Sequence, residues 1–427
     1  MRNLGQYKVK AGALQFTIFI SVLIALILTA FFLLNHIHQT FGKQGNLVKE
    51  TIHLADEGIV WARGGETKLG IYEIPYPGLR DFQFLTVDSK YWGAFQWVKS
   101  KAKSKAYSFE KNALLGGAEY QQEHFALIMS NTFSPLVIVG QTHIVGDVQI
   151  SEKGIKAGNM GGSFFQGEQL VKGKIKHRNG TIPQLPKDFE INLKNWIYDR
   201  FPNKADEVFW KQPKAFHNSF TQKTSWLYSK QPIYLDDEKY TGNLIIKSEK
   251  KISVSPLTQL DKVILIAPEI EIQNGFHGNL QAFATENILL QPNTRLNYPS
   301  VLVLYPKMNS EKIGNKENSI RQIKLVKNAR LKGCVFYLGE YTNQNLEAEI
   351  FLDNNSQIVG EIYNTQSTEL KGSIAGSVYT KSFVAHEFGS VYRNHIYNGN
   401  INARELHEKY AGILLKGKRK DVAQWLF

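Results

Sequence analysis

A row of four lysines at alternate positions is the part of this sequence that most directly suggests chemistry. The row consists of Lys99, Lys101, Lys103 and Lys105. In an extended strand these ammonium groups would share one face at intervals of roughly 6.6 Å, together with Trp97, Tyr107 and Phe109. Cations flanked by aromatic rings suit a polyanion, so the row predicts a binding face for an acidic polysaccharide, a nucleic acid or lipid headgroups. The alternative is an edge strand whose lysines prevent pairing with another chain.

Residue types that carry catalysis occur here without the spacing that catalysis needs. The densest acidic cluster, 236–238, lies beside a turn, and we interpret it as a solvated loop. His386 has no second histidine four residues later, as a zinc-protease helix would require. Cys334 is the single cysteine, and we interpret it as structural. The sequence therefore predicts a protein that is not an enzyme, with no catalytic residue, no cofactor and no metal ion.

Composition limits the class of protein. The chain has 427 residues, of which 43% are hydrophobic, and this content excludes wholesale disorder. A net charge of +13 favours polyanionic surroundings but does not bear on the fold. One cysteine excludes an intrachain disulfide and any site built from several cysteines.

Residues 11–34 form an uncharged apolar run near the N-terminus. As a helix they would be roughly 36 Å long, enough to cross a hydrocarbon core of about 30 Å. Arg2, Lys8 and Lys10 precede the run, so the positive-inside rule places residues 1–10 in the cytoplasm and the bulk of the chain outside it. The predicted location is the inner (cytoplasmic) membrane, crossed once. A cleaved secretory signal is the alternative, but its apolar core would be shorter.

Apolar residues continue at helical spacing beyond the membrane run. Ile37, Phe41, Val48 and Ile52 fit one face of a stalk helix over residues 35–65. Glycines at 42 and 45 weaken this helix, and the pair at 64 and 65 ends it.

The N-terminal segment resembles that of a type IV prepilin or a type II secretion pseudopilin. The resemblance rests on Lys8-Val9-Lys10-Ala11-Gly12, followed by the apolar run that starts at Ala13. It implies that a prepilin peptidase cuts between Gly12 and Ala13 and that the partners include other pilin-like subunits. Most pilins carry Glu at the fifth mature position, where this chain has Thr17, so the segment is similar to minor, tip-type subunits that lack this Glu. An ordinary single-pass anchor is the alternative.

The body contains an internal repeat. Three 15-residue stretches, Leu136–Ile150, Ile323–Tyr337 and Ile350–Asn364, align without gaps, with apolar residues at positions 1, 3, 9 and 13 and Gly at position 11. The last two begin 27 residues apart, a spacing typical of β-solenoid coils. The predicted fold is therefore mainly β, with an N-terminal transmembrane α-helix followed by an extracytoplasmic right-handed β-helix (β-solenoid) with an insertion. A β-sandwich or several small β domains would be the alternative.

These signals predict a division of the chain. The expected segments are a cytoplasmic leader (1–10), a transmembrane helix (11–34), a stalk helix (35–65), a small α+β neck (66–125), first solenoid coils (126–186), an insertion (187–239), further solenoid (240–402) and a C-terminal helical cap (403–427).

The function expected from these observations is a membrane-anchored, minor-pilin-like structural or assembly subunit of an envelope appendage or secretion apparatus. Two alternatives stay open. One is a membrane-tethered binding module for an acidic polysaccharide or nucleic acid, which an exposed lysine row in a groove would favour. The other is a carbohydrate-active β-helix enzyme, which an inward-facing carboxylate cluster would favour.

Overall fold

The computed structural model describes residues 11–64, 69–118, 125–130, 133–178, 180–199, 201, 207–209, 212–306, 320–340 and 346–426. The chain divides into two compact units. The smaller unit comprises Met1–Gly58, Glu73–Thr86 and Ser100–Glu110, and the larger comprises Ile59–Tyr72, Val87–Lys99 and Lys111–Phe427. The fold is mainly β, with one long N-terminal helix and a solenoid-like parallel sheet, which confirms the predicted fold class. The handedness of the winding and the extracytoplasmic location of the solenoid stay predictions.

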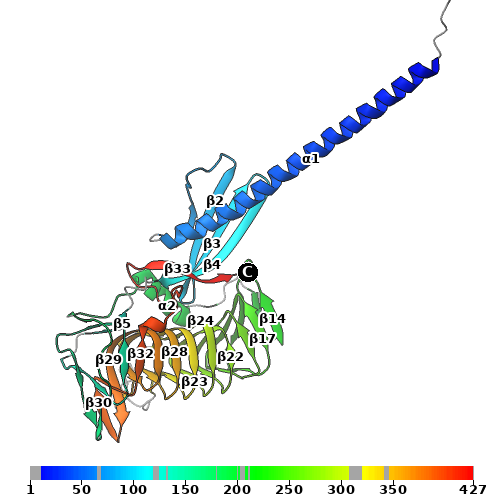
Figure 1. Cartoon of the computed structure of the whole chain (residues 1–427). Coiled ribbons are helices and arrows are strands. Elements are labelled where there is room, and N and C mark those ends of the chain that lie inside the picture. Colours follow the sequence, from blue (N-terminus) through cyan, green and yellow to red (C-terminus); the bar gives the residue numbers. More distant parts are fainter. Residues whose placement is uncertain are drawn as a thin grey trace, which may run out of the picture. The chain divides into compact units, whose positions relative to one another are not determined.

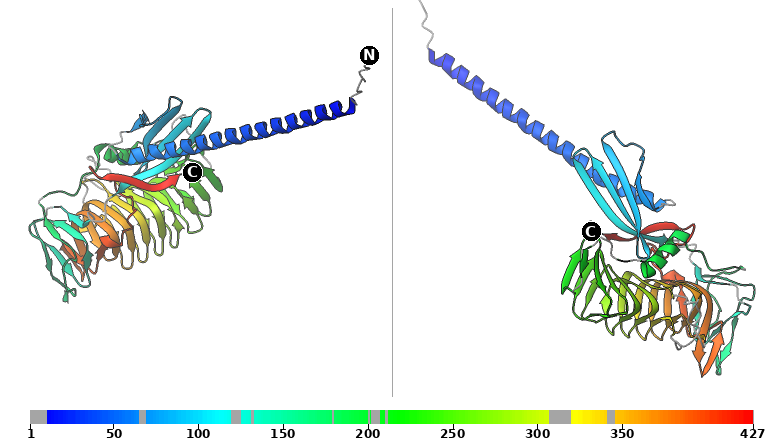
Figure 2. Two further views of the ribbon diagram at one scale, coloured as in Figure 1. Left: turned by 45° about the horizontal axis from the view of Figure 1, so that its top comes forward. Right: turned by 180° about the vertical axis from the view of Figure 1, so that it is seen from behind.

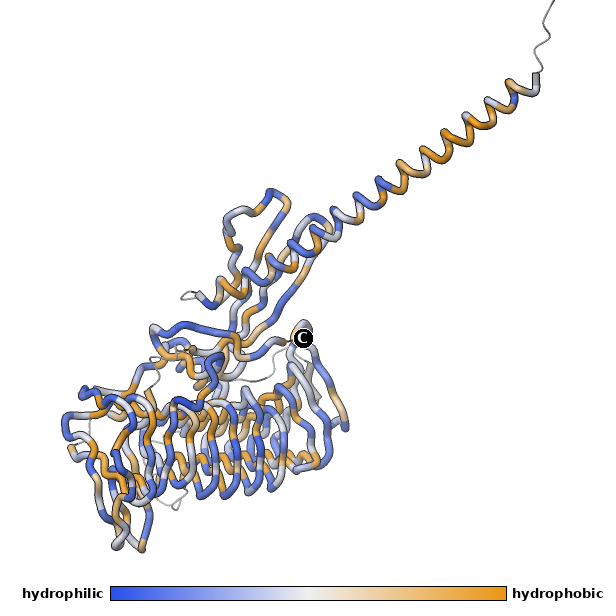
Figure 3. Tube along the Cα trace, viewed as in Figure 1, coloured by the Kyte–Doolittle hydropathy of each residue, from blue (hydrophilic) through white to orange (hydrophobic). Residues whose placement is uncertain are grey.

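One helix, α1 (Ala11–Gly64), contains both the predicted membrane helix and the predicted stalk (Figure 1). Gly42 and Gly45 lie inside it without ending it, since an interior glycine costs a helix only about 1 kcal/mol. The described part of the helix reaches Gly64. Figure 3 shows its residues changing from hydrophobic in the N-terminal half to mixed hydropathy beyond it.

A five-stranded sheet with strand order β1-β2-β3-β4-β33 is built mostly from the predicted neck. Its strands are β1 (Gly70–Glu73), β2 (Gln83–Trp92), β3 (Phe95–Ser104), β4 (Tyr107–Ala118) and β33 (Arg419–Leu426). Two-residue turns join β2 to β3 and β3 to β4, a length typical of tight hairpins. The described part of the neck holds strands only, so the α component expected there is not seen in these residues.

The helical cap predicted for residues 403–427 is wrong. Ala403–Glu405 form a single 3-10 turn, and β33 pairs antiparallel with β4. Between them Gly412 exchanges backbone hydrogen bonds with Gly117, at N···O distances of 2.7 and 2.9 Å. The three residues that follow, 413–415, are all buried. A continuous apolar run buried on every side lacks the periodicity that distinguishes a helix from an extended segment.

The larger unit contains a stack of strands. In chain order they are β5 (Phe125–Met129), β6 (Leu136–Val139), β7 (His143–Val145), β8 (Asp147–Ile150), β9 (Ile155–Ala157), β12 (Ile175–His177), β13 (Glu207–Phe209), β14 (Ala215–Asn218), β15 (Ser225–Ser229), β16 (Ile233–Leu235), β17 (Lys239–Gly242), β18 (Leu244–Ser248), β19 (Lys251–Val254), β20 (Gln259–Asp261), β21 (Val263–Ile272), β22 (His277–Gly278), β23 (Leu280–Leu290), β24 (Arg295–Leu304), β25 (Gln322–Leu325), β26 (Arg330–Tyr337), β27 (Ile350–Leu352), β28 (Gln357–Leu370), β29 (Ser373–Glu387), β31 (His395–Tyr397) and β32 (Asn400–Asn402). The short strands β10 (Asn159–Met160) and β11 (Ser163–Phe164) pair with each other, and β30 (Ser390–Arg393) forms an antiparallel hairpin with β29.

Successive coils pair in parallel and in the register that the repeat predicts. Leu331 lies beside Ile358 in the paired strands β26 and β28, and both are fully buried in the inner ladder. The repeat glycines also coincide: Gly333 lies beside Gly360, and both have positive φ. A Cβ at Gly360 would lie 1.9 Å from the carbonyl oxygen of Gly333, so only glycine allows the coils to approach this closely here.

The coils do not stack in the order of the sequence. Strand β29 pairs with β5, and β32 pairs with β7, so residues 125–177 continue the stack beyond residue 402. Figure 2 shows both ends: the strands of residues 125–177 follow the orange strands at one end, and the green strands β14 and β17 lie at the other. The first coils in the sequence are therefore the last in space, which the repeat alone could not reveal.

The predicted insertion, 187–239, is only partly an insertion. It contains helix α2 (Lys187–Tyr198), but coils resume at β13–β15 and not at Tyr240, because β15 already pairs with β18. The buried residues of α2, among them Phe189 and Trp196, share a core with Trp226 of β15. Strands covered by a helix on the outside and by the ladder on the inside are buried on both faces, so they lack the alternation that identifies half-buried strands.

Candidate functional site

The residues of the predicted cleavage site lie in the first turn of α1. Gly12 and Ala13 are exposed, and a Cβ added at Gly12 would meet nothing within 4 Å. The leader, residues 1–10, lies outside the described residues. Cleavage between Gly12 and Ala13 therefore stays a prediction, at a site that nothing in the described structure covers.

The N-terminal half of α1 has the properties of a membrane-spanning helix. All side chains from Leu14 to Leu34 are exposed, and the helix is long and apolar enough to cross a bilayer. The Thr17 hydroxyl donates to the Leu14 carbonyl at 2.9 Å, and the Thr29 hydroxyl donates to the Ala25 carbonyl at 2.7 Å. In hydrocarbon an unpaired hydroxyl is costly, so these bonds within the helix remove that cost.

The C-terminal half of α1 has a buried face. In the smaller unit Leu54 and Ala55 are buried, and a Cβ at Gly58 would lie 2.1 Å from Ser100 Oγ and 3.1 Å from Leu85 Cδ1. The helix backbone therefore lies directly against β2 and β3 in that unit. One helix thus combines a fully exposed apolar segment with a segment packed on a sheet.

The lysine row of the sequence does not form one continuous face. Lys99, Lys101 and Lys103 are on β3, but Lys105 starts a turn with φ 53°, after which the chain reverses into β4. The prediction that Tyr107 and Phe109 share the strand face of the lysines is therefore wrong, because both belong to β4. Lys101 and Lys103 are exposed, whereas Lys99 is half-buried. Polyanion binding by this row is not tested by the geometry.

Lys99 lines a cavity of about 260 Å³ in the larger unit. Lys90 and Lys223 also line it, and one carboxylate, that of Asp88, faces them. The Lys90 ammonium lies 3.9 Å from the ring centroid of Trp97, a cation–π distance. Three ammonium groups around one carboxylate give the cavity a net positive charge, which suits a single small anionic group.

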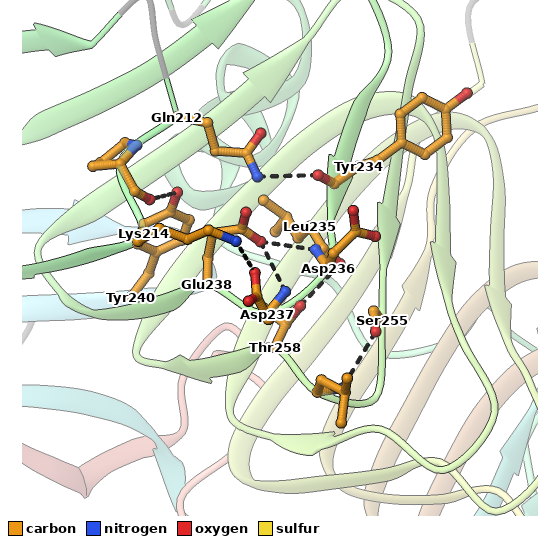
Figure 4. Close-up of polar contacts among 12 residues, drawn as sticks. Gln212, Lys214, Tyr234, Leu235, Asp236, Asp237, Glu238, Tyr240, Ser255 and Thr258 are labelled. Atoms are coloured by element: carbon orange, nitrogen blue, oxygen red, sulfur yellow. Dashed lines mark hydrogen bonds and ion pairs between the residues drawn. The ribbon is translucent and has the colours of Figure 1, made fainter.

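The acidic triplet forms a structured turn (Figure 4). The buried carboxylate of Glu238 accepts hydrogen bonds from the backbone N–H groups of Asp236 and Asp237, at 2.7 and 3.2 Å. Asp237 also pairs with Lys214. The solvated-loop interpretation holds for the exposed carboxylates of Asp236 and Asp237, but Glu238 is a structural acceptor inside the turn.

Two carboxylates of the solenoid, Glu269 and Glu271, line a cavity of about 290 Å³ on its outer face. The ammonium of Lys251 lies 2.6 Å from Glu271, and Gln291 donates to the same carboxylate at 3.0 Å. These bonds lower the pKa of Glu271, so it is an ionised structural partner and not a proton donor. The inner ladder contains fully buried apolar side chains such as Leu331 and Ile358, and the enzyme alternative stays a hypothesis.

His386 belongs to a closed ionic cluster at the end of β29. Its Nδ1 lies 2.8 Å from the buried carboxylate of Glu369, which also contacts Lys371 at 3.2 Å, and Lys371 bridges to Glu387 at 2.8 Å. The other ring nitrogen, Nε2, is buried and has no hydrogen-bond partner among the described residues. Sequence reasoning missed this pairing because Glu369 and His386 are one coil apart.

Cys334 lies beneath the C-terminal segment. Its sulfur is 3.3 Å from the hydroxyl of Tyr410, and burial raises the pKa of the thiol well above its usual value. Nearby, the buried carboxylate of Glu361 accepts the backbone N–H of Ile413 at 2.7 Å. A buried thiol with a raised pKa is a poor nucleophile, in agreement with the structural interpretation. Among the described residues no group of three metal-ligating side chains could hold a metal ion.

A second basic row, which sequence reasoning missed, lies on the last coil of the stack. We call residues 171–178 the terminal strand. Its cations are Lys172, Lys174, Lys176 and Arg178, and the whole of 172–178 is exposed. They have the same period of two as the lysines of β3, so the signal was available. An intervening glycine and histidine and the absence of neighbouring aromatic residues hid it.

No family model and no curated protein matches the chain. Among solved structures the chain is similar to the competence-associated pilin ComZ from Thermus thermophilus, at 9% identity and a TM-score of 0.20, over 90% of this chain and 95% of that one. A TM-score this low does not establish a shared fold, and the likeness carries no argument about function.

Proposed function

We propose that this protein is a membrane-anchored, minor-pilin-like structural or assembly subunit of an envelope appendage or secretion apparatus, and not an enzyme. The observation that carries the proposal is α1. A single helix has an exposed apolar N-terminal half and, near its C-terminal end, a face buried against a sheet in the smaller unit.

The exposed half needs an apolar environment. Large apolar side chains follow one another from Leu14 to Leu34 with no protein contact that covers them. An apolar surface of this extent is unfavourable in water, so lipid or the helices of neighbouring subunits would cover it. A subunit that moves from a bilayer into a helical assembly needs this kind of surface.

The first turns of the helix support a minor role in such an assembly. Most pilins have Glu at the fifth mature position, and here Thr17 satisfies its hydroxyl on its own helix. The first turns therefore lack the charged group that most pilins carry at this position. In this proposal α1 crosses the inner membrane, the N-terminus is cytoplasmic and the larger unit is extracytoplasmic, as the flanking charges favour.

Photo-crosslinking in the native membrane tests this role. A photoreactive phenylalanine analogue at Leu26, which is 64% exposed, should give an adduct with the apolar helix of another small membrane subunit. The matched control is Ile71, which is 72% exposed but lies beyond the apolar helix, and it should not give that adduct. Adducts to lipid alone from Leu26 would leave an ordinary single-pass anchor and contradict the proposal.

A further inference from the structure

The inference concerns the terminal strand, residues 171–178, which forms one end of the solenoid. Strand β12 lies near its C-terminal end and pairs with β8, placing Ile175 beside Val148 and His177 beside Ile150. Val148 and Ile150 are fully buried ladder residues. Val171, Ile175 and His177 therefore occupy inward positions, and the cations between them point outward.

The backbone of the terminal strand is bonded on one side. Lys172 donates to Ile144 at 2.8 Å, Val148 donates to Lys174 at 2.9 Å, and Arg178 donates to Ile150 at 2.9 Å. In a parallel ladder, alternate residues bond to opposite sides, so the amides and carbonyls of Gly173, Ile175 and His177 face the other side. No strand pairs with β12 on that side within the described part of the chain.

The inward positions of this end are incompletely covered. Ile175 is 39% exposed, although its ladder neighbour Val148 is fully buried. Leu170 and Val171 pack on the core but are only partly buried. This coil therefore presents an apolar strip and an open row of backbone donors and acceptors side by side.

The outward positions are all cationic. Lys176 pairs with Asp147 at 3.5 Å, while Lys172, Lys174 and Arg178 make no ion pair with any described residue. The four cations repeat every second residue, roughly 6.6 Å apart. An extended polypeptide repeats its own side chains at the same interval.

We infer that the terminal strand is a docking edge for an extended acidic polypeptide segment, which adds to the solenoid as one further strand. Its backbone pairs with the open side of β12, its apolar side chains cover Ile175, and its alternate carboxylates face the cations. An acidic polysaccharide could pair with the cations, but it could neither form strand hydrogen bonds with the open backbone edge nor cover the apolar strip. The inference does not depend on the pilin-like role.

Binding of a designed probe to the full-length protein in detergent tests the inference. The probe is a short fluorescent peptide of alternating glutamate and valine. Its binding is measured by fluorescence anisotropy at low salt. Its first control carries N-methyl groups on the valines, which remove backbone donors but keep the charge. The second control is an oligoglutamate. The alternating peptide should bind, and both controls should bind at least about tenfold more weakly, since they lack the backbone or the apolar contacts.

Two variants locate the site. Replacing Lys172, Lys174 and Arg178 with Gln should weaken binding by about tenfold or more, whereas a matched triple, Lys101→Gln, Lys103→Gln and Lys332→Gln, should not. All the replaced residues are exposed. Ile175→Pro removes an outward N–H from an edge strand, a position that tolerates proline, and should abolish binding without changing the melting temperature.

Three results would overturn the inference. The first is no binding by the wild type at low salt. The second is equal loss in the matched triple, which would show an effect of net charge alone. The third is oligoglutamate or an acidic polysaccharide binding as tightly as the alternating peptide, which would leave a charge patch and no docking edge.

Discussion

The N-terminal half of α1 and the inner ladder of the solenoid use the same side chains in opposite ways. Both are rich in Leu, Ile and Val, but those of α1 are exposed, as Leu26 is at 64%, whereas ladder residues such as Leu331 and Ile358 are fully buried. Burial of such a side chain contributes about 1.5–3 kcal/mol, so the ladder stabilises the fold of its own unit. The exposed side chains of α1 gain a comparable free energy only when lipid or another subunit buries them.

The largest expected effect is a loss of folding stability that occurs on substitution in the ladder and not in α1. Ile358→Asp would bury an uncompensated charge, which costs several kcal/mol, and Ile358→Ala should cost about 2–5 kcal/mol. Leu26→Ala in α1 should leave the free energy of unfolding of the solenoid unchanged. Denaturant unfolding of the detergent-solubilised protein, followed by circular dichroism, measures both. Equal destabilisation by the α1 and ladder variants would break the comparison.

A charge in α1 should act on membrane insertion and leave folding intact. Leu26→Asp places a carboxylate near the middle of the apolar run, at a cost to insertion of about 2.5–3.5 kcal/mol. The membrane-bound fraction should fall, while the circular dichroism spectrum of the released protein should keep its β signal. Leu257→Asp is the control, since Leu257 is 72% exposed on the solenoid, and it should change neither property.

Substitution of Lys418 measures how much a partly buried ammonium group near the C-terminal segment destabilises the larger unit. Burial lowers the pKa of Lys418 to about 8, so between about pH 8 and pH 10.4 the unfolded chain binds more protons than the folded one. The wild type should therefore gain stability as pH rises through that window. Lys418→Met should be more stable than the wild type by at most about 3 kcal/mol at pH 7, with a smaller difference at pH 10. A difference that does not depend on pH would show that packing, and not desolvation of the ammonium, is responsible.

The smallest effect concerns the packed half of α1. Gly58→Ala should cost about 1–3 kcal/mol, because its Cβ would meet Ser100 Oγ at 2.1 Å. Adding Ser100→Gly should recover part of that loss. Gly42→Ala is the control: nothing lies within 4 Å of its Cβ, so it should stabilise the helix by about 0.5–1 kcal/mol. Equal effects at Gly42 and Gly58 in thermal unfolding would contradict the close contact with the sheet.

Local signals predicted this molecule well, and pairings distant in sequence did not. The extent of α1 and the register of Leu331 with Ile358 follow from patterns inside one segment or one repeat. The order of coils, in which β5 follows β29, depends on pairings that leave no periodicity in the sequence. The strand β15 was missed because α2 covers it, and β33 because its partner β4 is about 300 residues away.

The candidate sites divide in the same way. The apolar segment could be located from composition, whereas the cleavage site at Gly12 and Ala13 stays a prediction from a short motif. The prediction that Lys99 and Phe109 share one strand face was wrong, because a single turn at Lys105 reverses the chain. The cations of the terminal strand lie beside an open strand edge because β12 is the end of the stack. Only the three-dimensional order of the coils reveals this position.

The central claim is that α1 is a pilin-like segment, and the N-terminus of the mature protein tests it most directly. Intact mass and N-terminal sequencing of the membrane-extracted protein should show a chain that begins at Ala13. A Gly12→Val variant should retain the leader, and Gly42→Val should be processed normally, since both positions have open space around a Cβ. A wild-type chain that begins at Met1 or Arg2 would contradict the pilin-like account and leave a plain membrane anchor. One that begins after residue 34 would show a cleaved signal.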